Sequence, residues 1–111
     1  MSSSLAERLS QCIGYRFEGP YLVIHNECGE PLKIEAVEVR YYISVFREEL
    51  DVRGRREIRE RISVGKTLSS GGILDIYFGP VENVVDVEVI VSVGDAEYRV
   101  KPRRLEASGE S

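Results

Sequence analysis

Residues 85–100 read VDVEVIVSVGDAEYRV, and this stretch decides the fold class. Valine occupies every second position from Val85 to Val93, with mostly polar residues between them. The pair Gly94-Asp95 is a two-residue hairpin signal, and the alternation resumes in residues 96–101. A strand whose side chains are apolar on one face and polar on the other predicts an antiparallel sheet with one wet face.

The same period of two recurs in short runs from Tyr15 to Lys101, separated by turn residues such as Gly29-Glu30-Pro31 and Gly71-Gly72. The apolar positions that share a face are Leu22 and Ile24; Val37, Val39, Tyr41, Ile43 and Val45; and Leu74, Ile76 and Phe78. We count six or seven such strands. They predict two antiparallel sheets packed face to face in a single all-β sandwich.

The composition limits the class of protein. The chain has 111 residues, enough for one domain with its own core. With 42% hydrophobic and 31% charged residues it does not have the composition of a disordered polyelectrolyte. No apolar run approaches the ~20 residues that span a bilayer. The formal net charge of −4 argues against a domain that binds nucleic acid by bulk electrostatics.

The balance of charged residues bears on the source of the protein. There are 12 arginines against 3 lysines, 15 glutamates against 4 aspartates, and only three side-chain amides. Many charges able to form ion-pair networks, with few thermolabile amides, predict a thermophilic source. Genomic base composition also raises the arginine content and is the alternative explanation.

A short amphipathic helix is expected in residues 1–14. Ser4 and Glu7 form a capping box at its start, and Gly14 suits its end. The apolar positions of one helix face are Leu5, Leu9, Cys12 and Ile13. So short a helix must dock on something, either as a lid over an open end or edge of the sheet or as the stub of a longer pilin-like helix. The sandwich domain is expected over residues 15–104, and a disordered tail over 105–111.

Residues 47–61 carry six arginines and five acidic residues and fit either a hairpin or a helix. We favour the hairpin, with a three-residue loop at 53–55. That loop gives these cross-strand pairs: Leu50 with Ile58, Phe46 with Ile62, and Glu49 with Arg59. In the helix, Leu50, Ile58 and Ile62 would also align, but Gly54 would cost ~1 kcal/mol against alanine.

The arginines of this segment are the candidate partner-binding residues, namely Arg47, Arg53, Arg55, Arg56, Arg59 and Arg61. Arginine pairs bidentately with carboxylate or phosphate. Acidic residues are interleaved here and stacking aromatics are missing from the outer face, which disfavours nucleic acid as the partner. A solvated hairpin with internal ion pairs, which protects a sheet edge from aggregation, is the structural alternative.

Cys12, His25 and Cys28 are the only soft metal ligands in the chain. A structural zinc site needs four ligands, and Glu27 would have to supply the fourth. The two cysteines could instead form a disulfide, which would close a 16-residue separation and contribute ~3 kcal/mol. Two independent thiols are the third possibility and the one we favour. We expect neither a bound metal nor a cofactor.

No arrangement of residues predicts catalysis. Gly65-Lys66-Thr67 resembles the end of a phosphate-binding loop, but Glu60 stands where the motif needs glycine, and no helix follows. A Ser–His–carboxylate site would need His25 from an ordinary strand, and no serine lies in a Gly-x-Ser-x-Gly elbow. The neighbouring carboxylates Glu48 and Glu49 point to opposite faces of a strand, so they cannot share a substrate proton. The sequence therefore predicts a protein that is not an enzyme.

One stretch carries a family resemblance. A strand ends at Asn26, the Gly29-Glu30-Pro31 turn follows, and the next strand opens with aliphatic residues; 68–80 and the final 87–98 hairpin continue the pattern. Over about Tyr21–Val100 the chain resembles the immunoglobulin-like sandwich modules of archaeal cell-surface, pilin-like and archaellum-associated proteins. The resemblance implies an immunoglobulin-like fold and a structural or interaction role, and it transfers no functional residues.

We therefore expect a non-catalytic interaction or structural module from a thermophilic archaeon. It would bind a protein partner, which could be a second copy, through the 47–61 hairpin or an exposed sheet edge. The alternative is a cytoplasmic subunit of a nucleoprotein or enzyme complex that contacts its partner or a phosphate backbone through the arginines. The chain starts without a secretory signal. Its location is then cytoplasmic if the chain is complete, and the cell surface if an N-terminal anchor has been removed.

Overall fold

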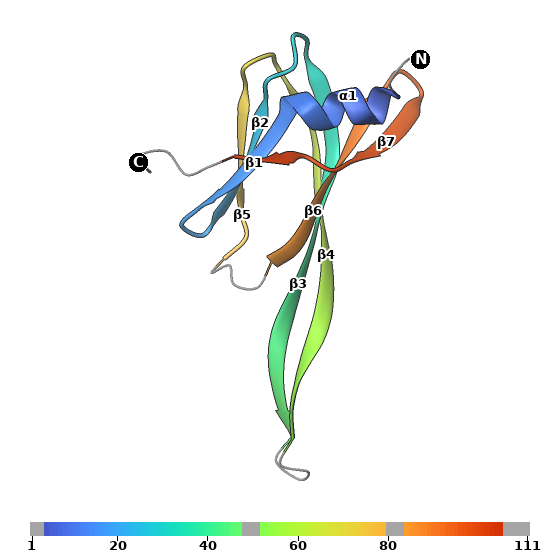
Figure 1. The fold of residues 1–111 in the computed structure, drawn as a ribbon. Coiled ribbons are helices and arrows are strands. Elements are labelled where there is room, and N and C mark those ends of the chain that lie inside the picture. Colours follow the sequence, from blue (N-terminus) through green and yellow to red (C-terminus); the bar gives the residue numbers. More distant parts are fainter. Residues whose placement is uncertain (1–3, 48–51, 80–83, 106–111) are drawn as a thin grey trace.

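The computed structural model describes residues 4–47, 52–79 and 84–105 (Figure 1). Within these ranges one helix precedes eight strands. In chain order the elements are α1 (Leu5–Cys12), β1 (Ile13–Glu18), β2 (Tyr21–Asn26), β3 (Leu32–Arg47), β4 (Val52–Leu68), β5 (Ile73–Tyr77), β6 (Val84–Val93), β7 (Ala96–Val100) and β8 (Arg103–Arg104). The predicted all-β class with a short helix is confirmed. The predicted count of six or seven strands is too low.

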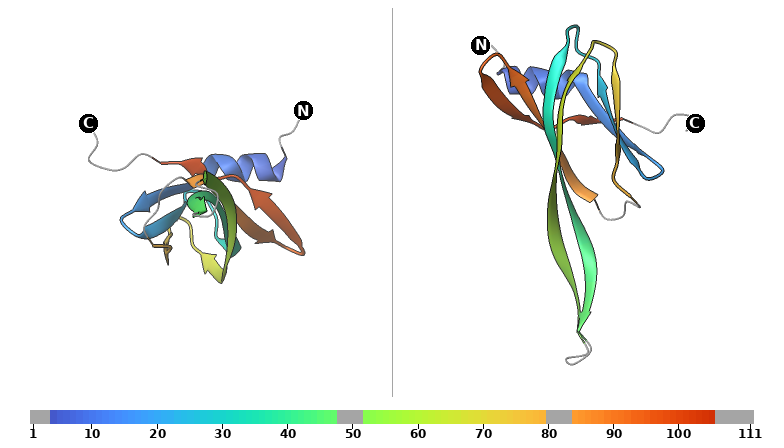
Figure 2. Two further views of the ribbon diagram at one scale, coloured as in Figure 1. Left: turned by 90° about the horizontal axis from the view of Figure 1, so that it is seen from below. Right: turned by 180° about the vertical axis from the view of Figure 1, so that it is seen from behind.

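The strands form two four-stranded sheets. One has the order β5-β2-β1-β8 and the other the order β4-β3-β6-β7. All neighbours are antiparallel except β1 and β8, which are parallel. Figure 2 shows the two sheets from below and from behind, with α1 lying across one side.

One hydrophobic core lies between the sheets. Its fully buried members come from both, and the largest are Ile13, Leu22, Ile24, Ile34, Val37, Val39, Val89, Val91 and Val100. The apolar stripes predicted on 22–24, 37–39 and 87–91 are therefore confirmed. The stripe on 85–93 is wrong at both ends: Val85 is 48% exposed beside a register shift between β3 and β6, and Val93 is 38% exposed next to the Gly94-Asp95 turn.

Helix α1 packs on the sandwich instead of standing free. The predicted capping box is present: the Ser4 Oγ accepts from the Glu7 N–H and the Ser4 N–H donates to the Glu7 carboxylate, both at 3.1 Å. Leu9 is buried in the core, and the helix lies against β1, β7 and β8. The helix is shorter than the predicted 1–14, because Ile13 is already extended and starts β1.

The prediction that Gly14 ends the helix is wrong. Gly14 lies in β1, and a Cβ there would come within 2.8 Å of the Leu105 side chain. Leu105, the predicted first residue of the tail, donates its N–H to the Tyr15 carbonyl at 2.8 Å. The rest of that predicted tail, 106–111, lies outside the described residues. A glycine in β1 thus allows the chain after β8 to pack closely.

Strands β3 and β4 extend beyond the other strands of the sandwich, and we call the sandwich without this extension, together with α1, the body. The last pair between β3 and β6 is Tyr41 with Val84. Beyond it, residues 42–47 of β3 have residues 52–57 of β4 as their one strand partner within the described ranges, and we call these two segments the arm. Six residue pairs extend about 20 Å. Figures 1 and 2 show the arm projecting from the body.

Candidate interaction site

The hairpin predicted for 47–61 is present as part of the β3–β4 pair, but in another register, and only its residues up to Glu57 belong to the arm. Phe46 pairs with Arg53, Ile62 pairs with Val37, and Gly54 lies within β4 instead of in the loop. The predicted Phe46–Ile62 pair and the 53–55 loop are therefore wrong; Glu49 and Leu50 lie outside the described residues. The physical reason is that β4 continues to Leu68. The apolar pairs of the body fix the register, and the pairing then continues as far as Arg47 with Val52.

The predicted partner-binding arginines are spread along the arm and its root. Arg47 ends β3, and Arg53 and Arg55 lie in β4; their side chains are outside the described part of the structure. Arg56 is exposed opposite Ile43. Arg59 and Arg61 lie on the body, where they pair with Glu57 at 3.5 Å and Glu38 at 3.2 Å. The structure thus places four of the six on the arm, and ion pairs already engage the other two.

The outer face of the β4-β3-β6-β7 sheet carries a charge network. Its members are Glu38, Arg40, Glu57, Arg59, Arg61, Asp86, Glu88, Arg99 and Lys101. Most of them line an open concavity of about 310 Å³. The network follows from sequence alternation: charged residues lie between the buried valines of β3 and β6, and the register brings opposite charges side by side.

Glu38 is the centre of this network. It accepts from Arg99 Nη1 at 2.6 Å and from Arg61 Nη1 at 3.2 Å, and Arg99 also bonds Glu88 at 2.8 Å. The Arg99 hydrogen bond, with the charges of Arg99 and Arg61, lowers the pKa of the Glu38 carboxyl against a smaller opposing effect of burial. The same bonds, to Glu38 first and Glu88 second, raise the pKa of Arg99. Both shifts favour the charged forms of Glu38 and Arg99.

Replacing Glu38 with glutamine should make unfolding less sensitive to acid. Because the folded-state pKa of Glu38 is lowered, its contribution to stability is present above its unfolded-state pKa and is lost as the pH falls through the folded-state value. We expect Glu38→Gln to lower the free energy of unfolding by about 0.5–1 kcal/mol at pH 7 and by less at pH 3. Urea titrations at both pH values measure this difference.

Glu97→Gln is the matched control, since Glu97 makes no ion pair with any described residue and should show no such dependence. An equal loss for Glu38→Gln at pH 7 and pH 3 would contradict an ionic role for Glu38.

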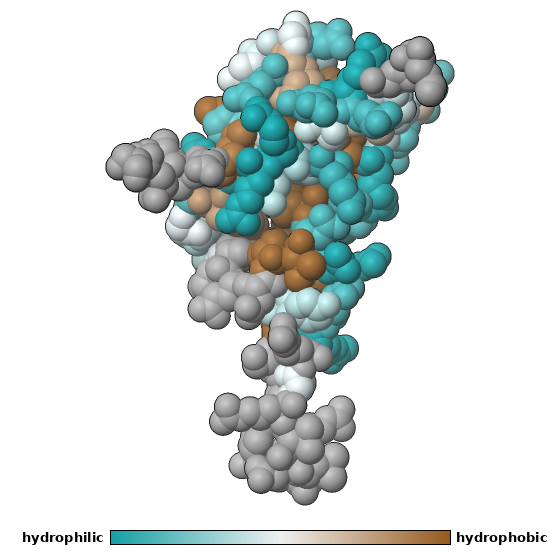
Figure 3. Space-filling model, viewed as in Figure 1, coloured by the Kyte–Doolittle hydropathy of each residue, from teal (hydrophilic) through white to brown (hydrophobic). Residues whose placement is uncertain are grey.

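Apolar surface lies at the root of the arm. Ile43 is 39% exposed, because the stripe predicted on 37–45 continues past the end of the opposite sheet. Figure 3 shows apolar surface over the start of β6, just above the arm. Tyr41 closes the core there: its ring lies edge-on to Phe78 at 5.6 Å, and its hydroxyl donates to Glu60 at 3.0 Å. That carboxylate raises the Tyr41 pKa, as does burial to a smaller extent.

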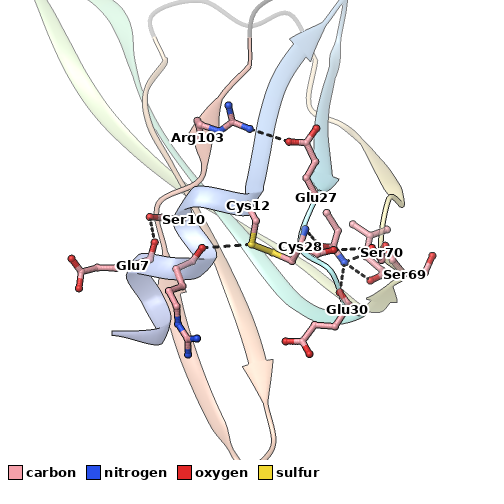
Figure 4. Close-up of a disulfide and its surroundings, with 12 residues drawn as sticks. Glu7, Ser10, Cys12, Glu27, Cys28, Glu30, Ser69, Ser70 and Arg103 are labelled. Carbon is pink, nitrogen blue, oxygen red and sulfur yellow. Dashed lines mark hydrogen bonds and ion pairs between the residues drawn. A yellow bond between two sulfur atoms is a disulfide. The ribbon is translucent and has the colours of Figure 1, made fainter. Parts of the chain in front are cut away.

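A disulfide joins Cys12 and Cys28, whose Cα atoms lie 4.8 Å apart (Figure 4). The independent thiols favoured from sequence are therefore wrong. The bond ties the end of α1 to the loop after β2. Two hydrogen bonds flank it: the Glu27 N–H donates to the Cys12 carbonyl at 2.8 Å, and the Ser70 hydroxyl donates to the Cys28 carbonyl at 2.8 Å.

Asn26 is the one buried polar side chain of the described residues, and the sequence reasoning did not single it out. Its amide nitrogen contacts the carbonyls of Glu30 (3.0 Å), Leu68 (2.9 Å) and Ser69 (3.1 Å). Its oxygen accepts from the Cys28 N–H at 2.9 Å. This one side chain thus fastens the loop after β2 to the turn between β4 and β5. An asparagine at a strand end was the only available signal.

The residues considered for chemistry have structural roles. Both thiols are in the disulfide, and His25 Nε2 accepts from Arg16 Nε at 3.2 Å. Within the described ranges, no group of three or more His, Cys, Asp or Glu side chains is placed to hold a metal. Gly65-Lys66-Thr67 lies inside β4, where Gly65 has φ +63° near a register shift, so it is a bulge and not a phosphate loop.

Sequence reasoning also missed the outer face of β2 and β5. Tyr21, Ile73 and Tyr77 are 44%, 54% and 68% exposed, the last two on an edge strand. A signal was available, because Ile73 and Tyr77 lie on the strand face opposite Leu74, Ile76 and Phe78.

Comparisons with known proteins do not assign this chain to a family. No helix among the described residues is long and apolar enough to cross a membrane. Searches of protein-family models, of curated proteins and of solved structures found no match to this chain.

Proposed function

We propose that this chain is a non-catalytic interaction module that binds a protein partner through the arm. The proposal rests on one observation: β3 stops pairing with β6 at Tyr41, and beyond that residue β3 and β4 continue as a two-stranded ribbon. A ribbon of two strands is marginally stable in water by itself. A long ribbon with no third strand in the described structure is therefore well suited to pair with, or lie on, another molecule.

Charge and polarity favour a protein partner over a phosphate backbone. Residues 42–57 contain four arginines and four acidic residues, so this segment has no net positive charge. Arg59 and Arg61, at the root, already pair with carboxylates. Ile43 adds exposed apolar surface, which contributes to protein interfaces and not to phosphate contacts.

An armless variant tests the proposal. Replacing residues 43–56 with Asn-Gly joins the Tyr42–Glu57 pair by a two-residue hairpin loop and leaves the body intact. Proteins retained from a lysate of the source cell by the immobilised intact chain should be lost with the armless variant. Mass spectrometry of both eluates makes the comparison.

Two outcomes would contradict the proposal. One is the same set of retained proteins for both baits. The other is retention that depends on the arm and disappears after nuclease treatment, which would favour the alternative, a nucleoprotein subunit. Charge reversal by Arg56→Glu is a second variant that keeps the arm and changes only its described, exposed arginine.

We also propose an immunoglobulin-like topology for the sandwich. If β1 to β7 are lettered A, B, C, C′, E, F and G, one sheet has the order E-B-A and the other C′-C-F-G, as in that architecture. The parallel β1–β8 pair is an addition to that order. This correspondence supports the family resemblance of the sequence without adding a functional residue.

A further inference from the structure

Strand β5 lies at the free edge of its sheet, and the register shows which of its backbone groups point away from β2. It ends its sheet, and β2 is its one neighbouring strand in the described part of the chain. The Asn26 N–H donates to the Gly72 carbonyl at 3.0 Å and the Phe78 N–H donates to the Pro20 carbonyl at 2.9 Å. Hydrogen-bonded pairs alternate along an antiparallel ladder, so Leu74 and Ile76 bond to β2. The N–H and C=O groups of 73, 75 and 77 point to the open side.

The side chains of these same three residues are exposed. Leu74, Ile76 and Phe78 pack on the core, so Ile73, Asp75 and Tyr77 alternate onto the outer face. Tyr21 pairs with Tyr77, and their rings lie edge to face at 5.6 Å. The edge therefore offers three backbone donors and acceptors beside an apolar, an acidic and an aromatic side chain.

Asp75 has no hydrogen bond or ion pair with any described residue. Asp75 pairs with Val23 of β2, which is 3% exposed, and Val23 in turn pairs with Arg16 of β1. That guanidinium is already engaged, because it pairs with Glu18 and donates to His25. The middle of the edge thus carries one uncompensated negative charge flanked by apolar surface.

We propose that the β5 edge binds an extended segment of a protein partner by strand addition. The segment carries Lys or Arg opposite Asp75, with apolar residues two positions away on either side, opposite Ile73 and Tyr77. Main-chain hydrogen bonds supply the affinity, and the alternate side chains supply the specificity. This site is separate from the arm and does not depend on the function proposed for it.

A second copy of this chain fits the edge poorly. Two β5 strands related by a twofold axis would place Asp75 directly opposite its own copy, and like charges in that position are destabilising. Shifting the register by two residues relieves that contact but loses pairs from a strand of only five residues. A basic segment of another protein satisfies the charge and the full length of the edge.

The test is an NMR titration of the ¹⁵N-labelled chain with two blocked synthetic peptides. Thr-Val-Thr-Arg-Thr-Val-Thr has the proposed pattern, and the same peptide with Glu in place of Arg is its control. Both sequences are palindromic, so either strand direction gives the same pairs. We expect the Arg peptide to bind at least tenfold more tightly, with the amide shifts of residues 73, 75 and 77 changing most.

Two variants make the result specific. Asp75→Lys should reverse the preference between the peptides. Ile73→Pro removes one outward N–H while leaving the β2 bonds and Asp75 in place, and should weaken both peptides. The armless variant should bind the Arg peptide as the intact chain does, which separates this site from the arm.

Three results would overturn the proposal: no binding of the Arg peptide, equal binding of the two peptides, or an unchanged preference in a folded Asp75→Lys variant.

Discussion

Replacing Asn26 with alanine is expected to lower the free energy of unfolding by about 3 kcal/mol, the largest effect we expect from a single side chain. The side chain is 1% exposed; its amide nitrogen contacts three backbone carbonyls, and its oxygen accepts from one N–H. Losing it removes all four contacts at once, from one buried N–H and three partly buried carbonyls. For a domain of this size the melting temperature should fall by more than about 10 °C.

The isosteric Asn26→Asp variant separates hydrogen bonding from packing. Its carboxylate would face the carbonyls of Glu30, Leu68 and Ser69 and could donate to them only when protonated. The folded-state pKa of the new carboxyl would therefore be raised, so the variant should be less destabilised at pH 4 than at pH 7.

Thermal unfolding by circular dichroism measures both variants. Ser70→Ala is the control for the same loop, because it removes one hydrogen bond at an exposed turn residue and should cost about 1 kcal/mol or less. Equal melting temperatures for Asn26→Ala and Ser70→Ala would show that Asn26 is not the fastener of this end of the sandwich.

Loss of the Cys12–Cys28 disulfide is expected to cost about 3 kcal/mol, since the bond closes a separation of 16 residues. The double variant Cys12→Ser, Cys28→Ser should therefore melt about 10 °C or more below the intact chain. Helix α1 should loosen first, because it is too short to persist without its attachment. Unfolding curves in the presence and absence of dithiothreitol give the measurement.

The double serine variant also supplies the control. Dithiothreitol should lower the melting temperature of the intact chain and leave that of the serine variant unchanged. An intact chain that melts at the same temperature with and without reductant would contradict a stabilising disulfide.

The sequence predicted the features that depend on neighbours along the chain. The 85–100 hairpin, the Ser4–Glu7 capping box and the Gly71-Gly72 turn all need only local patterns, and all are present. The register of β3 and β4 was predicted wrongly, because local pairs near Gly54 were weighed without the apolar pairs far along both strands.

Other features depend on where a strand ends relative to its neighbours in space. The apolar stripe on β3 continues unchanged from Val37 to Val45 in the sequence. Its first half is core, while Ile43 is exposed, because the opposite sheet stops short of it. The disulfide was likewise undecided, since a separation of 16 residues does not determine the distance between the two Cα atoms.

The candidate site was predicted only in part. The arginines of 47–61 do lie along two paired strands, and the hairpin favoured over a helix is therefore confirmed, but Arg59 and Arg61 belong to the charge network of the body. No spacing rule connects Glu38 with Arg99, which are 61 residues apart and meet through the sheet order. The exposed edge around Asp75 was not predicted, because apolar residues in a strand, such as its neighbours Ile73 and Tyr77, are ordinarily assigned to the core.

Thermal unfolding of the armless variant, in which Asn-Gly replaces residues 43–56, tests most directly whether the arm serves a partner or the fold. Among the described residues, the arm contributes no strand pairing to the body beyond Tyr41, so the variant should unfold cooperatively within a few degrees of the intact chain. A variant that fails to fold, or melts far lower, would show that the β3–β4 extension is part of the core and would contradict its assignment as a binding element.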